Sequence, residues 1–232
     1  MPKLIIDIET VGENFDEMDN VTKEVLTKYI DKDNPEALEE VKESLVFSPL
    51  TGQIVAIGVM DYDKGQGVVY YQSPEVKAVE TKEGNFKFKP MMESEMLENF
   101  WQGVQNYDEI ITFNGRSFDI PYIIARSAKW QVEATKDLMG NRYIDNQKFG
   151  VKHIDLFDQL SFYGSVKKTG GLHMWCRLLG ITSPKIEGVK GDDVKELFKT
   201  REYLTIAKYN TRDLVATKEL YDYWHRFMRG KN

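Results

Sequence analysis

Leu4-Ile5-Ile6-Asp7-Ile8-Glu9-Thr10 is an apolar run that two acids interrupt near its end. Successive side chains of a β-strand point to opposite faces, so Asp7 and Glu9 share one face while Ile6 and Ile8 share the other. Carboxylates held side by side repel and raise each other's pKa, and a shared divalent cation relieves that repulsion. The alternative is a solvated strand end with two surface acids, because short acidic patterns are common. Further ligands elsewhere in the chain would favour the metal site.

Composition indicates a globular protein with one core. The 232 residues are 41% hydrophobic and 29% charged, so we expect a single domain over residues 1–232. The single cysteine, Cys176, excludes an internal disulfide, and three scattered histidines give no zinc-finger spacing. No apolar run approaches the roughly 18 residues that a membrane span needs, and we expect a cytoplasmic protein that makes no membrane contact.

The formal net charge of −6 argues against a protein that coats nucleic acid non-specifically, since such proteins are basic. It does not exclude a nuclease, because bound metal offsets the negative charge of a carboxylate site.

The acid-rich stretch after the first strand is an expected helical insertion at about residues 14–50. Apolar residues at helical spacing predict two helices between Asn14 and Ser48, and Asn34-Pro35 starts the second one. One interpretation is a charged helical pair packed on the sheet for stability, and the other is a lid that shields substrate.

The remaining elements alternate between strands and helices. Strands are expected at 53–62, 68–71, 109–113 and 153–156, and residues 73–90 form a loop or a short ribbon. Helices are expected near 96–104, from about 119, from 157 to 162 or 163, at 172–179 and over 203–229, the last as one long helix or a helix pair. Trp101 falls on the core face of its helix and is interpreted as a core residue, not as a platform for base stacking.

Two later segments place acids where they can join Asp7 and Glu9. Ser117 is expected to cap a helix whose apolar face is Ile120, Ile123, Ile124 and Ala128, and this places Asp119 in the first turn beyond a strand. Tyr209 and Asp213 are four residues apart and therefore share one helix face, about 5 to 6 Å apart at their β-carbons.

Asp7-Ile8-Glu9, the Asn114 to Asp119 segment and the Tyr209 to Asp213 segment together resemble the three motifs of the DEDD 3′-5′ exonucleases. The chain is most similar to the tyrosine-bearing DEDDy branch, related to the proofreading domain of family B DNA polymerases. The histidine branch has His where this chain has Lys208. The resemblance runs from Met1 to about Trp224 and implies an α/β, ribonuclease H-like fold. Such a fold has a mixed sheet of about five strands, three of them antiparallel, with helices on both faces.

The resemblance also implies two divalent cations, Mg²⁺ or Mn²⁺, held by hard oxygen ligands. Asp7 would bridge both cations, Glu9 and Asp213 would complete the nucleophile-side site, and Asp119 would serve the second cation, partly through water. Tyr209 would orient the attacking water, and its ordinary pKa near 10 favours positioning over base catalysis.

Three residues are similar to substrate contacts of the family. Asn114 and Phe118 would hold the terminal nucleotide, Phe118 by a stacking interaction that tolerates any base. Lys185 is a further candidate for the substrate, with a solvated loop lysine as the alternative.

The implied function is a metal-dependent 3′-5′ exonuclease that releases nucleoside monophosphates from the 3′ end of single-stranded DNA. An exoribonuclease is the first alternative, because no residue pattern here recognises the 2′ hydroxyl that distinguishes RNA. A non-catalytic nucleic-acid-binding domain is the second, and the presence of all four acids and the tyrosine disfavours it. Proofreading would need a polymerase partner in trans.

Overall fold

In this computed structural model the described residues are 1–31, 34–73, 79–185 and 191–230, and their strands form one mixed sheet in the order β4-β5-β3-β2-β1-β6-β7. The strands are β1 (Lys3–Gly12), β2 (Gly52–Asp61), β3 (Gln66–Gln72), β4 (Thr81–Glu83), β5 (Phe86–Met91), β6 (Glu109–Thr112) and β7 (Lys152–Asp155).

Eight α-helices connect or flank these strands in the part of the chain that the structure describes. They are α1 (Asn20–Leu26), α2 (Pro35–Ser44), α3 (Glu93–Val104), α4 (Asp119–Lys129), α5 (Leu156–Leu160), α6 (Leu172–Leu179), α7 (Val194–Lys199) and α8 (Tyr203–Tyr223). Short 3₁₀ turns lie at Phe15–Glu17, Leu45–Phe47, Ile144–Asn146 and Gly191–Asp193, and a π-helical turn, Trp224–Met228, follows α8.

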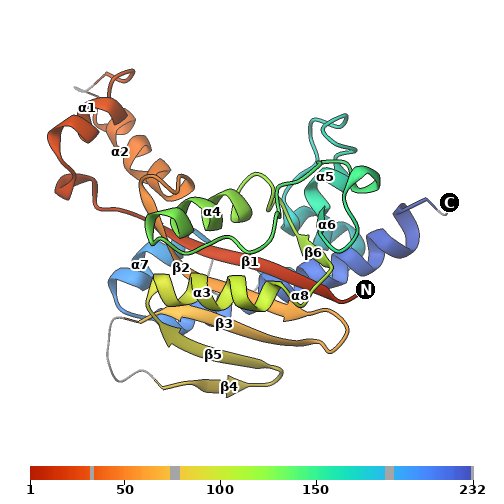
Figure 1. The fold of residues 1–232 in the computed structure, drawn as a ribbon. Helices are drawn as coiled ribbons and strands as arrows, with labels where there is room; N and C mark the ends of the chain where they lie inside the picture. The colour runs from red at the N-terminus through yellow and green to blue at the C-terminus, as the bar shows by residue number, and fades with distance from the viewer. Residues whose placement is uncertain (32–33, 74–78, 186–190, 231–232) are drawn as a thin grey trace.

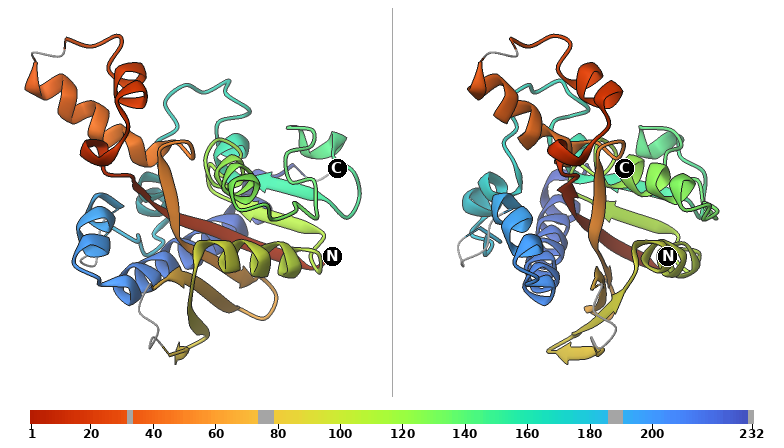
Figure 2. Two further views of the ribbon diagram at one scale, coloured as in Figure 1. Left: turned by 60° about the vertical axis from the view of Figure 1, so that its left-hand side comes forward. Right: turned by 90° about the vertical axis from the view of Figure 1, so that its left-hand side faces the viewer.

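The sheet lies between two helical layers, with α3 and α4 on one face and α6, α7 and α8 on the other (Figures 1 and 2). Strands β1, β2 and β3 are antiparallel, and β6 and β7 continue parallel to β1. This is the ribonuclease H-like arrangement expected from the sequence. The sheet has seven strands instead of about five, because β5 pairs parallel to β3 and β4 pairs with β5.

The alternation in β1 divides the core as predicted. Leu4, Ile6 and Ile8 pack in the cluster that also contains Phe100 of α3 and Ile123 of α4. Ile5 packs instead with residues of α8 on the opposite face. Asp7 and Glu9 have the parity of Ile5, so their side chains project toward α8. Trp101 is 1% exposed, which confirms it as a core residue.

The inserted helical pair is present, but the expectation that it packs on the sheet is wrong. Neither α1 nor α2 has a buried residue, and Val21 and Val25 of α1 are 70% and 66% exposed. The pair projects away from the sheet beyond the end of β1 (Figures 1 and 2). Its base is anchored through buried Phe15 and Leu45, and Thr27, which follows α1, is also buried. The lid interpretation stays a prediction.

Helix α4 begins at Asp119 as expected and buries Ile120 and Ile123 as predicted, but its cap and the rest of its predicted apolar face differ from the prediction. Phe118, not Ser117, occupies the N-cap position, and Ile124 and Ala128 are exposed. Arg126 takes a core position because it forms a 2.7 Å ion pair with buried Glu93 of α3. A paired arginine can be buried where an unpaired one cannot.

Candidate active site

Helix α8 brings a third acid to the two acids of β1. Ligand oxygens from Asp7, Glu9 and Asp213 all lie within 4.8 Å of one another. The pairing of β1 with β2 shifts register between Glu9 and Thr10, and such irregularities re-aim side chains near functional sites. The structure therefore assembles three of the four predicted metal ligands into one cluster.

Asp119 reaches the same region from the other side of β1. Strand β6 pairs with β1 only from Lys3 to Ile5, so Ile8 further along β1 has no β6 partner. The Ile8 N–H donates instead to Oδ1 of Asp119, at 3.1 Å. Asp119 is thus tied to the backbone between the two β1 acids, although it stands outside the group of three carboxylates.

These acids line a small hollow, of about 160 Å³, that we call the acidic hollow. Its walls contain every predicted catalytic residue and two of the three predicted substrate residues. The lining residues are Asp7, Ile8, Glu9, Phe113, Asn114, Phe118, Asp119, Tyr209 and Asp213. Segments more than a hundred residues apart in the chain therefore meet at one surface.

The acidic hollow disfavours charge on its own carboxylates. Burial raises the pKa of Asp7 well above its ordinary value, and the neighbouring acids raise it further. Burial and the charge of Asp213 likewise raise the pKa of Glu9. Burial raises the pKa of Asp213 to about 7, although hydrogen bonding from Tyr209 and the charge of Lys185 lower it.

The donor set fits a hard divalent cation. Every ligand atom in the cluster is a carboxylate oxygen, the type that Mg²⁺ and Mn²⁺ prefer. Oδ2 of Asp213 is buried and has no hydrogen-bond partner, which leaves it available as a ligand. A cation would also remove the repulsion that raises these pKa values.

Tyr209 contributes a hydroxyl that stays protonated. Its side chain is 6% exposed, and burial raises the pKa of the phenol, with further contributions from Asp213, Glu9 and Asp7. The group is suited to donate or orient a hydrogen bond, because ionisation beside three carboxylates is strongly unfavourable.

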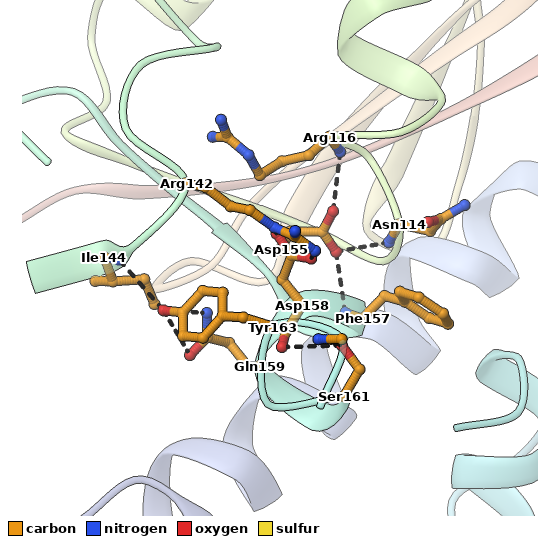
Figure 3. Close-up of polar contacts among 11 residues, drawn as sticks. Asn114, Arg116, Arg142, Ile144, Asp155, Phe157, Asp158, Gln159, Ser161 and Tyr163 are labelled. Carbon is orange, nitrogen blue, oxygen red and sulfur yellow. Dashed lines mark hydrogen bonds and ion pairs between the residues drawn. The ribbon is translucent and has the colours of Figure 1, made fainter. Parts of the chain in front are cut away.

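The loop that carries Asn114 is shaped by Asp155 at the end of β7 (Figure 3). The N–H groups of Asn114 and Arg116 donate to the two carboxylate oxygens of Asp155, at 2.8 and 2.9 Å. The N–H of Phe157 adds a third bond at 2.9 Å. Asn114 has a φ of 66°, a left-handed conformation that these contacts stabilise. Asp155 was not among the predicted site residues, although an acid at the end of a buried strand was the available signal.

The other two predicted substrate residues have different settings. Phe118 is half-buried, lines the acidic hollow and packs at a tilt on Tyr122, with ring centroids 5.4 Å apart. Lys185 is exposed and does not line the acidic hollow, but its charge reaches Asp213 and lowers the pKa of that acid.

A larger cavity, of about 1040 Å³, lies at the far end of α8, between Tyr62, Tyr163 and Trp224. Two acids line it, Asp145 and Asp222, and Asp222 already accepts hydrogen bonds from Tyr62 and from Lys218. The chemistry therefore favours the smaller hollow, where carboxylates converge without cationic side chains.

The comparisons with known proteins agree with this geometry. The model of a protein family described as a predicted 3′-5′ exonuclease related to the exonuclease domain of PolB matches residues 48–231. The chain belongs to this family. The matched range contains the Asn114 to Asp119 and Tyr209 to Asp213 segments, while Asp7 and Glu9 precede it.

Relatives of this PolB-type exonuclease include DNA polymerases. DNA polymerase 1 of Sulfurisphaera ohwakuensis is 23% identical over 92% of the chain, and the DNA polymerase of Thermococcus litoralis is 27% identical over 69%. The chain spans 26% and 10% of those two proteins. The family B DNA polymerase of Pyrobaculum calidifontis superposes on 97% of the chain with a TM-score of 0.59 and 17% identity, and the match covers 24% of that polymerase. This likeness supports the ribonuclease H-like fold.

Within the part of the chain that the structure describes, the helices are all too short or too polar to cross a membrane.

Proposed function

We propose that this protein is a metal-dependent 3′-5′ exonuclease that hydrolyses single-stranded DNA and releases nucleoside monophosphates. The convergence of Asp7, Glu9 and Asp213 within 4.8 Å is the observation that carries the proposal. Family membership supports the nuclease class, and the polymerase names of the relatives support DNA as the substrate.

Asp7, Glu9 and Asp213 would hold divalent cations, with Asp119 completing the site from α4. When bound, the cations supply positive charge that offsets the carboxylates and stabilises the charge that develops on the scissile phosphate. Tyr209, which stays protonated, would orient the water that attacks phosphorus in line with the departing 3′ oxygen. Cleavage yields a nucleoside 5′-monophosphate and a strand one nucleotide shorter with a 3′ hydroxyl.

The terminal nucleotide would be held by the residues on the other wall of the acidic hollow. Phe118 exposes part of its ring there and would stack on the last base, and Asn114 would hydrogen-bond to it or to its sugar. Both residues approach without reading a particular base, which suits an enzyme that removes nucleotides in succession.

The test uses 5′-labelled oligonucleotides of one sequence as single-stranded DNA, duplex DNA and RNA, each with Mg²⁺, Mn²⁺ or a chelator. We expect a ladder of shortening labelled products on single-stranded DNA, no cleavage in chelator, and resistance of a strand with a phosphorothioate 3′ end. The folded Asp7→Ala variant should be inactive. Faster cleavage of RNA would reassign the substrate, and internal cuts or immediate release of the labelled nucleotide would contradict the proposal.

A further inference from the structure

Asn210 is the fully buried residue between Tyr209 and the rest of the α8 motif, at 0% exposure. Its Nδ2 donates to Oδ2 of Asp7 at 2.7 Å. The Asn210 amide therefore links α8 directly to the first acid of β1.

We propose that Asn210 is a positioning residue that fixes the Asp7 carboxylate for cation binding, and that Gly58 provides the space it needs. This inference rests on the proposed metal-dependent function. Among crowded acids, a neutral donor restricts rotation of the carboxylate without adding a charge that competes with the cation. Outer groups of this kind commonly orient metal ligands.

Gly58 of β2 lies directly opposite Asp7 in the β1–β2 ladder. A Cβ at Gly58 would stand 1.8 Å from Oδ1 of Asn210 and 2.8 Å from Cδ1 of Leu214. Gly58 has no positive φ, so its backbone conformation does not demand glycine. The absence of a side chain is what lets the Asn210 amide lie between α8 and the sheet.

The buried Asn210 amide does not favour the stability of the fold. Oδ1 of Asn210 is buried and has no hydrogen-bond donor. A buried polar atom without a partner destabilises a fold, and an apolar side chain of similar shape would avoid that loss. Residues that break this rule are expected at functional sites. The amide is therefore better explained by what Nδ2 does for Asp7 than by packing.

The test compares Asn210→Leu with Thr217→Val, a near-isosteric change at a buried polar residue seven positions further along α8. Each folded variant is titrated calorimetrically with Mn²⁺ alone, without nucleic acid. We expect Asn210→Leu to bind Mn²⁺ about 10- to 100-fold more weakly, the usual effect of losing an outer-shell partner, and Thr217→Val to bind as the parent does. If Asn210→Leu does not fold, Asn210→Ala replaces it, because a smaller side chain cannot overpack the site.

Gly58→Ala provides an approach that leaves Asn210 in the chain. It should weaken Mn²⁺ binding in the parent but much less in an Asn210→Ala background, where the displaced amide is already gone. Parent-like Mn²⁺ affinity in the Asn210 variants would overturn the inference while leaving the proposed function intact. A parent protein that binds no Mn²⁺ would instead contradict the proposed function.

Discussion

Tyr209 and Asp213 face the same hollow from one turn of α8, but their chemistry assigns them different tasks. Asp213 has a buried oxygen without a donor and belongs to the carboxylate cluster. Tyr209 offers a hydroxyl whose pKa burial raises above its ordinary value, so it cannot serve as an anionic ligand near neutral pH. Substitutions at the two positions should therefore differ in kind.

Tyr209→Phe removes one hydroxyl and keeps the ring, so packing and the four acids persist. We expect the maximum rate to fall by about 10- to 1,000-fold, or about 1.4 to 4 kcal/mol of barrier, with an unchanged metal requirement. Asp213→Asn should lower the rate and also raise the Mn²⁺ concentration needed for half-maximal activity. Metal titrations on one single-stranded substrate distinguish the two. An undiminished rate in Tyr209→Phe would mean that another group orients the water.

Phe118 tests the nucleotide-holding wall of the acidic hollow. Its ring is shared between the hollow and the core cluster around Tyr122. Phe118→Ala should weaken binding of a short single-stranded oligonucleotide by about 1 to 3 kcal/mol, the usual value of one base stack. Binding is measured in Ca²⁺ to suppress cleavage, with Phe118→Leu as the control that keeps apolar packing but removes the aromatic face. Equal affinity in both variants and the parent would assign Phe118 to the core alone.

The loop between β6 and α4 depends on β7 for its shape. Asp155 accepts hydrogen bonds from two N–H groups of the loop. Asp158, three residues along the chain, instead forms an ion pair with Arg142 (Figure 3). In Asp155→Asn an amide N–H₂ group replaces one of the two accepting oxygens. This donor then faces at least one backbone N–H donor, so the loop must shift. We expect a loss of about 100-fold in kcat/KM, typical of a misplaced site, with circular dichroism unchanged.

Asp158→Asn is the matched control for that loop variant. It removes a buried acid three residues away and breaks the ion pair with Arg142 without touching the loop amides. Its stability should fall while its kcat/KM stays within a few-fold of the parent. Equal loss of activity in both variants would show that general stability, not loop geometry, limits the enzyme.

The elements that the sequence predicted well are those in which one local pattern determines burial. Alternation in β1 gave the correct faces for Asp7 and Ile8, and the i, i+4 spacing gave the correct side of α8 for Tyr209 and Asp213. These patterns need no knowledge of distant partners.

The errors arose where a distant residue decides the outcome. Periodicity treats Arg126 as a surface residue, because the sequence does not reveal that Glu93 neutralises it. Helical spacing likewise predicts that Val21 and Val25 form a packing face, although no described element covers them. Asn210 and Gly58 were missed because their significance lies in a contact across 152 positions, between Gly58 and the Asn210 amide. No spacing within either segment indicates such a contact.

Charge is unevenly distributed over the protein. Residues 13–48 carry 11 acids against four lysines, so this stretch accounts for more than the net charge of −6. The stretch follows directly from the strand that carries Asp7 and Glu9, and its helices project into solvent (Figure 2). Its negative field should repel a nucleic-acid strand that approaches the acidic hollow at low ionic strength.

Neutralising α2 tests this field. A variant in which Glu36, Glu39, Glu40 and Glu43 are replaced by Gln should bind single-stranded DNA roughly two- to tenfold more tightly in low salt, and the gain should vanish in high salt. The control replaces the same number of exposed glutamates elsewhere in the chain, Glu98, Glu133, Glu196 and Glu219. An equal or larger effect from the control set would show that only total charge matters, and tighter binding that persists in high salt would indicate direct contact of the strand with α2.

Protonation of the acidic hollow links the stability of the fold to pH and to metal. In the metal-free fold burial raises the pKa values of Asp7 and Glu9, and it raises those of Asp119 and Asp213 to about 7. In the unfolded chain these acids titrate near pH 4. The folded state therefore holds protons that the unfolded state has released, and the free energy of unfolding falls as pH rises through about 7.

The measurement is the melting temperature in chelator at about pH 6.5 and about pH 8.5. This window avoids buried His153, whose pKa burial lowers to about 4 and whose contribution runs in the opposite direction below about 6.5. We expect the melting temperature to fall by roughly 2 to 8 °C across the window, and saturating Mn²⁺ to reverse the fall because it binds the ionised acids. In Asp7→Asn, which removes one acid from the cluster, both the fall and the Mn²⁺ effect should shrink. A metal-free protein that becomes more stable at the higher pH, or an Asp7→Asn protein that keeps the full Mn²⁺ response, would show that the carboxylates are not held together as the structure places them.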